Sequence, residues 1–76
     1  MLWNDSITVE FNNFCENLKK LRIENNLTKK AMAEKLDVTT RTISMIENHE
    51  IPKTLTVEFV YSVIRTFKVD GADLFK

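Results

Sequence analysis

The stretch that decides the fold runs from residue 28 to residue 48 and reads Thr28-Lys29-Lys30-Ala31-Met32-Ala33-Glu34-Lys35-Leu36, Asp37-Val38, Thr39-Thr40-Arg41-Thr42-Ile43-Ser44-Met45-Ile46-Glu47-Asn48. Its two longer parts each open on a threonine, whose hydroxyl accepts a hydrogen bond from an unpaired backbone N–H of a first helical turn. Apolar residues recur at helical spacing in both parts. The pattern predicts two short amphipathic helices separated only by Asp37 and Val38.

Two short helices with a tight turn between them have the layout of a helix-turn-helix. In that motif the second helix lies in the major groove of DNA and presents side chains to the edges of the bases. The spacing turns Met32, Ala33 and Leu36 inward in the first helix, and Ile43 and Ile46 inward in the second. Four side chains of the second helix are then left to face outward: Thr40, Arg41, Ser44 and Met45.

Composition predicts one small, all-α domain. The chain has 76 residues, of which 43% are hydrophobic, with one glycine and one proline. This hydrophobic share favours a compact fold over disorder. Because hairpin turns depend on glycine and proline, their scarcity favours helices. No apolar run reaches the roughly 18 residues that a membrane span needs, and the acidic, Asn-rich start does not read as a signal peptide.

The single cysteine, Cys15, cannot form an internal disulfide, and no Cys/His cluster has the spacing of zinc ligands. A reducing, cytoplasmic location is therefore expected, with no metal, no cofactor, no membrane and no small-molecule ligand. One histidine, one cysteine and scattered carboxylates form no recognisable catalytic set, which argues against an enzyme. Cys15, next to Phe14, is interpreted as a partly buried filler rather than as a nucleophile.

Charge is unevenly distributed although the net charge is zero. Residues 19–41 carry seven basic and three acidic side chains, a net charge of +4, whereas residues 1–18 carry −3 and residues 42–76 carry −1. A zero total counts against strong nonspecific binding to nucleic acid. The positive charge lies on the suspected motif, where it indicates either DNA phosphates as partners or a solvated helix face.

The flanking sequence predicts further helices. Residues 1–9 are read as an extension, and residues 10–76 as the domain. A first helix is expected from about residue 9 or 10 to Asn25, with Asn25-Asn26 as its stop. Thr56 is a candidate cap for a fourth helix, with five residues on its core side: Val57, Val60, Tyr61, Ile64 and Phe67. A final helical turn spans residues 72–75, with Leu74 or Phe75 closing the core.

From about Asn17 to Phe75 the chain resembles the Xre/Cro-like, lambda repressor-like domains of phages and bacteria. Four blocks carry the resemblance: residues 18–22, residues 27–38, residues 42–48, and the closing Val69…Leu74-Phe75. It implies a compact five-helix bundle that binds double-stranded operator DNA, commonly as a two-fold homodimer. The function implied is that of a sequence-specific transcriptional regulator, a repressor.

The resemblance also implies roles for individual residues. Thr40 and Arg41 match base-reading positions, with Ser44 and Met45 as secondary contacts one turn on. Arginine bonds two acceptors on guanine, and threonine or methionine packs on the thymine methyl group. Five residues are expected at phosphates: Thr28, Lys29, Lys30, Thr39 and Lys53.

Four positions show how closely this chain keeps the family pattern. Where this chain has Lys29, the family often has glutamine. A lysine there favours contact with a phosphate over the contact network that a glutamine amide can form. Where this chain has His49, the family often has glycine, and a histidine there would be strained in a left-handed conformation. His49 is either a plain loop residue or a phosphate contact. Arg22 and Glu47 match a salt bridge between the first and third helices of several relatives, the alternative being two solvated charges.

Dimerisation is expected because one helix reads only a few base pairs. Four residues look like more apolar area than one small core needs and are predicted as the dimer surface: Phe59, Val63, Phe67 and Phe75. The alternative is that they are core or scattered surface. The zero net charge also leaves a second function open, that of a protein-binding module on the same scaffold, such as an antitoxin or adaptor.

Overall fold

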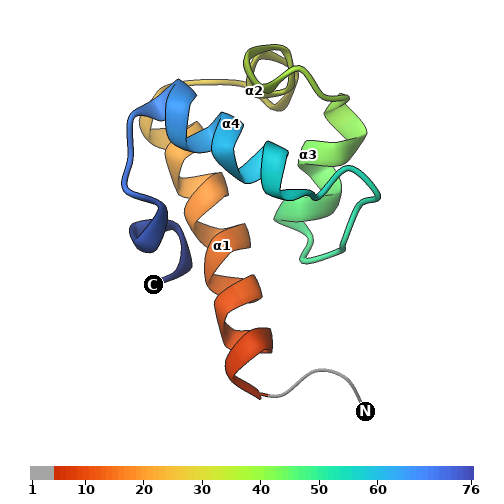
Figure 1. The fold of residues 1–76 in the computed structure, drawn as a ribbon. Helices are drawn as coiled ribbons and strands as arrows, with labels where there is room; N and C mark the ends of the chain where they lie inside the picture. The colour runs from red at the N-terminus through yellow and green to blue at the C-terminus, as the bar shows by residue number, and fades with distance from the viewer. Residues whose placement is uncertain (1–4) are drawn as a thin grey trace.

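A computed structural model describes residues 5–76, which form four α-helices and a closing 3-10 helix with no strand among them (Figure 1). The elements are α1 (Asp5–Glu24), α2 (Lys29–Leu36), α3 (Thr40–Glu47), α4 (Val57–Phe67) and η1 (Gly71–Phe75). The predicted all-α bundle with a helix-turn-helix is confirmed, and its fifth helix is the 3-10 turn. None of these helices is long and apolar enough to cross a lipid bilayer.

The first helix begins earlier than the sequence pattern predicted. α1 starts at Asp5 rather than at residue 9 or 10, so residues 5–9 belong to the helix and not to an extension. Ile7, Thr8 and Val9 have a preference for strands, but extending a helix that is already nucleated costs far less than starting one. Residues 1–4 of the predicted extension lie outside the described part of the chain.

Three of the helices begin at a threonine cap. The hydroxyl of Thr28 accepts from the backbone N–H of Ala31 at 3.0 Å, and that of Thr39 from Thr42 at 3.1 Å. At the start of α4, Thr56 accepts from Phe59 at 3.2 Å. Each such cap contributes about 1 kcal/mol to a helix that is short and marginal by itself.

All four α-helices are followed closely by a residue in the left-handed conformation, and none of these residues is glycine. The residues are Asn26, Asp37, His49 and Lys68, with φ between 55° and 63°. Asparagine, aspartate and histidine occur in this conformation more often than other residues with a Cβ, such as lysine. The only glycine, Gly71, instead permits close packing, because a Cβ there would lie 3.1 Å from Cδ1 of Ile64.

The core is built around α1, which crosses the centre of the molecule (Figure 1). Every element contributes to its fully buried residues, which are Phe14, Cys15, Leu18, Met32, Ala33, Leu36, Ile43, Ile46, Phe59, Val63 and Leu74. The ring of Phe14 stacks on Phe75, with centroids 5.3 Å apart, and meets Phe59 edge-on. Asn17 fastens η1 to α1 by donating to the carbonyl of Leu74 at 2.9 Å.

The orientation of α4 differs from the predicted one. Phe59 and Val63 are buried in the core, whereas Val57 and Tyr61, expected inward, are exposed. Apolar residues occupy most of the circumference of this helix, so periodicity alone does not determine which side packs inward. Phe59 and Val63 are therefore not part of a dimer surface. Of the other two residues predicted there, Phe67 is partly buried against the core and Phe75 is 37% exposed.

The strained end of α4 leads to a prediction about stability. Lys68→Gly should raise the free energy of unfolding by about 0.5 to 1 kcal/mol, because glycine adopts positive φ without the Cβ clash. Lys68→Ala is the matched control, since it removes the same side chain but keeps the Cβ, and should give no gain. Urea unfolding of both variants checks this; an equal effect of glycine and alanine would contradict the conformational explanation.

Cys15 gives a second prediction. Burial, reinforced by the neighbouring Glu16 charge, raises the pKa of its thiol from 9.0 to about 11. The thiol is therefore protonated at neutral pH, and a disulfide reagent should modify it slowly in the folded chain and rapidly in urea. Since the unfolded thiol ionises first, the free energy of unfolding should also fall between about pH 9 and about pH 11. Equal reaction rates in the two states would show that the thiol is accessible.

Candidate nucleic-acid interface

α2 and α3 are joined by a turn that fixes their relative direction. Asp37 has φ 59° and ψ 46°, and the following N–H of Val38 donates back to the carbonyl of Ala33 at 2.9 Å. Thr39 then caps α3. Ala33 is buried in the core, where its small side chain leaves room for α3 to approach. The chain between residues 28 and 48 thus forms the predicted helix-turn-helix.

The four outward residues of α3 lie on one side of the helix. Thr40 and Arg41 are exposed, and Ser44 and Met45, one turn on, are half-buried. On the opposite side Ile43 and Ile46 are completely buried. Burial of this inward side holds the helix against the core, and the predicted base-reading side chains remain accessible from solvent.

The predicted phosphate-binding residues lie at the starts of α2 and α3 and in the loop after α3. Thr28, Lys30, Thr39 and Lys53 are exposed, and Lys29 is half-buried. None of the four basic side chains Lys29, Lys30, Arg41 and Lys53 is in an ion pair with another residue of the described range. The backbone N–H groups of a helix start favour an anion, and these unpaired cations reinforce that preference.

A chain of threonine hydroxyls connects the start of α3 to the loop before α4. Thr42 Oγ1 lies 3.1 Å from Thr39 Oγ1 and 3.2 Å from Thr54 Oγ1. These contacts hold Lys53, the neighbour of Thr54, close to the first turn of α3. Sequence reasoning did not identify Thr42 and Thr54 as positioning residues. The available signal was Thr42 itself, a hydroxyl on the inward side of a short helix, which needs a partner when buried.

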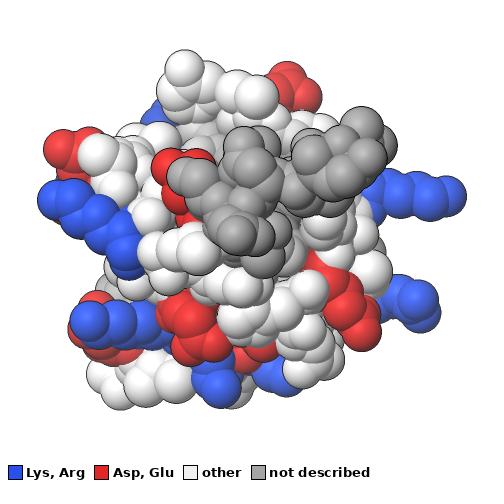
Figure 2. Space-filling model, turned by 90° about the horizontal axis from the view of Figure 1, so that it is seen from below, with Lys and Arg blue, Asp and Glu red and all other residues white. Residues whose placement is uncertain are grey.

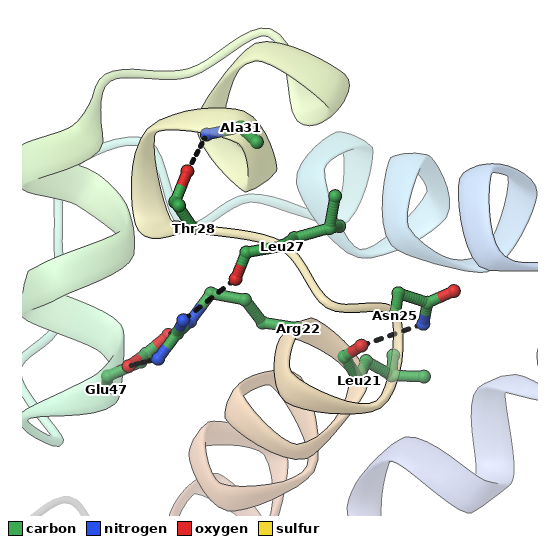
Figure 3. Close-up of polar contacts among 7 residues, drawn as sticks. All are labelled: Leu21, Arg22, Asn25, Leu27, Thr28, Ala31 and Glu47. Carbon is green, nitrogen blue, oxygen red and sulfur yellow. Dashed lines mark hydrogen bonds and ion pairs between the residues drawn. The ribbon is translucent and has the colours of Figure 1, made fainter.

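Arg22 and Glu47 form a bidentate ion pair between α1 and the end of α3 (Figure 3). Nε donates to Oε2 at 2.6 Å and Nη2 to Oε1 at 3.1 Å, while Nη1 donates to the carbonyl of Leu27 at 3.0 Å. The two side chains are only 15% and 5% exposed. The hydrogen bond to Glu47 raises the pKa of Arg22, which remains charged. This one guanidinium therefore holds α1, α3 and the segment that enters α2.

His49 also connects α3 to α1. Its Nδ1 lies 2.8 Å from Oδ1 of Asn12, and its Nε2 lies 2.8 Å from Oε2 of Glu16. The backbone of His49 is left-handed, with φ 63°, although the residue is not glycine. The imidazole is thus bound to α1 and is not positioned for a phosphate.

Figure 2 shows the face of the molecule seen from the end where α1 begins, below the view of Figure 1. Acidic side chains lie within this face, and lysine and arginine side chains lie mainly around its rim. A surface of mixed charge has little attraction for a polyanion. The cations Lys29, Lys30, Arg41 and Lys53, unpaired among residues 5–76, lie on α2, α3 and the following loop, which form the candidate nucleic-acid interface.

Comparison with known families agrees with this geometry. The profile of a helix-turn-helix domain family matches residues 15–76, which cover most of the chain and all of α2, α3, α4 and η1. The protein belongs to this helix-turn-helix family, which is part of the Xre/Cro-like group. No curated protein and no solved structure matches the chain.

The Arg22–Glu47 pair leads to a prediction. Arg22→Met and Glu47→Gln should each lower the free energy of unfolding by about 3 kcal/mol, because either change leaves a buried charge without its partner. The combined variant Arg22→Met with Glu47→Met should lose less than the sum, since it removes both charges. Chemical unfolding of the three variants measures this. Single losses below about 0.5 kcal/mol, typical of exposed pairs, would contradict the proposed burial.

Proposed function

We propose that this protein is a sequence-specific DNA-binding transcriptional regulator, a repressor that reads operator DNA with α3 in the major groove. One observation carries the proposal: the outer side of α3 presents Thr40, Arg41, Ser44 and Met45 to solvent while its inner side is buried. Membership of the helix-turn-helix family supports the same conclusion. We place its activity in the cytoplasm, where a free cysteine stays reduced.

The two groups of residues have different tasks in this proposal. Arg41 reads guanine through its paired N–H groups, and Thr40, Ser44 and Met45 contact neighbouring bases. Contacts to phosphates supply affinity without sequence information. They come from Thr28, Lys29, Lys30, Thr39 and Lys53, which flank α3 at the starts of α2 and α3 and in the following loop.

The regulator acts on DNA as a homodimer. One exposed helix side of this size covers only a few base pairs, and a two-fold pair reads two half-sites about one helical turn apart. No metal, cofactor or small-molecule ligand enters the proposed activity.

Two substitutions distinguish a residue that recognises the base sequence from a residue that adds affinity for any DNA. Arg41→Ala should cost about 1 to 3 kcal/mol on a cognate duplex and little on a scrambled one, because it removes base contacts. Lys30→Ala should weaken binding to both duplexes alike and reduce the salt dependence by about one phosphate contact. Fluorescence anisotropy with a duplex selected from random sequences measures both. An equal loss of binding free energy on the two duplexes for Arg41→Ala would show that Arg41 does not recognise bases.

A second function, a protein-binding module on the same scaffold, is favoured by two observations. The net charge is zero, and large apolar side chains of α4 and η1 are exposed. The salt dependence discriminates between the two functions, because DNA binding through several lysines weakens steeply as salt is added. Absence of a salt-dependent complex with any duplex would favour the module.

A further inference from the structure

An apolar surface that the chain's own core covers only in part runs along α4 and onto η1. We call it the α4 face, and it consists of Val57, Val60, Tyr61, Ile64, Ala72 and Phe75. Val57 is 70% exposed and Tyr61 55%. These residues line a groove of about 440 Å³ between the two elements, and Val60 and Phe75 also border a second groove that continues to Phe11 and Leu55. A contiguous apolar surface of this kind marks a contact site rather than scattered exposure.

The α4 face has the periodicity of a helix that packs against another helix. Its members on α4 follow each other at steps of three, one and three residues, which places them on a single stripe. Phe59 and Val63, which are buried, lie beside this stripe and not in it. One side of α4 therefore packs in the protein's own core, and a second apolar side is available to contact a partner.

Two charges border the stripe. Glu58 and Arg65 are seven residues apart, so they project from the same side of α4, two turns from each other. Both are exposed, and neither forms an ion pair with another residue of the described range. One end of the stripe is therefore negative and the other positive.

We propose that a second copy of this chain docks on the α4 face, with the two α4 helices antiparallel about a two-fold axis near Tyr61. A two-fold contact joins the same patch on both copies, so the patch must complement itself. In the antiparallel arrangement Glu58 of each copy lies near Arg65 of the other, and the apolar stripes face each other. A parallel two-fold arrangement would place the charged flanks of the two copies on opposite sides of the contact, so that no Glu58–Arg65 pair could form. The inference rests on the proposed dimeric regulator and assigns its interface.

Sedimentation equilibrium of the full chain tests the interface. The native chain should form dimers, and Tyr61→Glu should weaken dimerisation by roughly tenfold or more, since it places a charge in an apolar contact. Ile23→Glu is the matched control, because Ile23 is also 55% exposed but lies on α1, where it borders a different groove. It should dimerise like the native chain. Thermal unfolding followed by circular dichroism verifies that both variants fold.

Charge reversal tests the antiparallel orientation. Arg65→Glu alone should weaken the dimer, because each copy then presents two acidic side chains to the other. Adding Glu58→Arg should restore it, since the pairs are re-formed with reversed sign. A native chain that is monomeric at every concentration, an unchanged dimer in Tyr61→Glu, or failure of the double reversal would each overturn the proposal.

Binding to a duplex that carries only one half-site of the operator distinguishes a failure of this interface from a failure of the proposed function. Tyr61→Glu should bind one half-site as the native chain does and lose its cooperative binding to a full operator. If the native chain dimerises through Tyr61 but binds no half-site, the regulator proposal fails while the interface stands. If Tyr61→Glu keeps cooperative binding to the full operator, the interface assignment fails while the regulator stands.

Discussion

The buried ion pair of Arg22 and Glu47 is the interaction on which the arrangement of the helices depends. α3 has eight residues, too few to be stable in water without packing. Ile43 and Ile46 bury its inner side, but apolar contacts alone permit sliding and rotation. The bidentate geometry sets the end of α3 against α1, and the bond to Leu27 sets the approach to α2 from the same guanidinium (Figure 3).

The same contacts explain why the outer side of α3 suits recognition. Its two ends are held separately, the first by the hydroxyls of Thr39, Thr42 and Thr54 and the last by Glu47 and by His49 just beyond it. A helix fixed at both ends presents its remaining side chains with little loss of conformational freedom on binding. The basic residues Lys29, Lys30 and Lys53 form no ion pair within the described range, so they are available to phosphates.

Sequence reasoning predicted the parts of the molecule in which local chemistry and packing agree. The threonine caps, the stops after α1 and α2, and the inward residues of α2 and α3 follow from spacing and hydrogen-bonding capacity. The side of α4 that faces the core could not be predicted, because Val57, Phe59 and Tyr61 all look suitable until the neighbouring helices are in place. The partners of His49 were also out of reach, since Asn12 and Glu16 lie more than thirty positions away along the chain.

The central claim is that the outer side of α3 contacts bases while the core side of the bundle stays unchanged. An NMR titration of the isotope-labelled chain with a duplex selected from random sequences tests it most directly. The largest shifts are expected at Thr40, Arg41 and Ser44, smaller ones at the starts of α2 and α3, and little change at Ile43 and Ile46. Unperturbed signals along α3, with the shifts confined to α1 or η1, would contradict it.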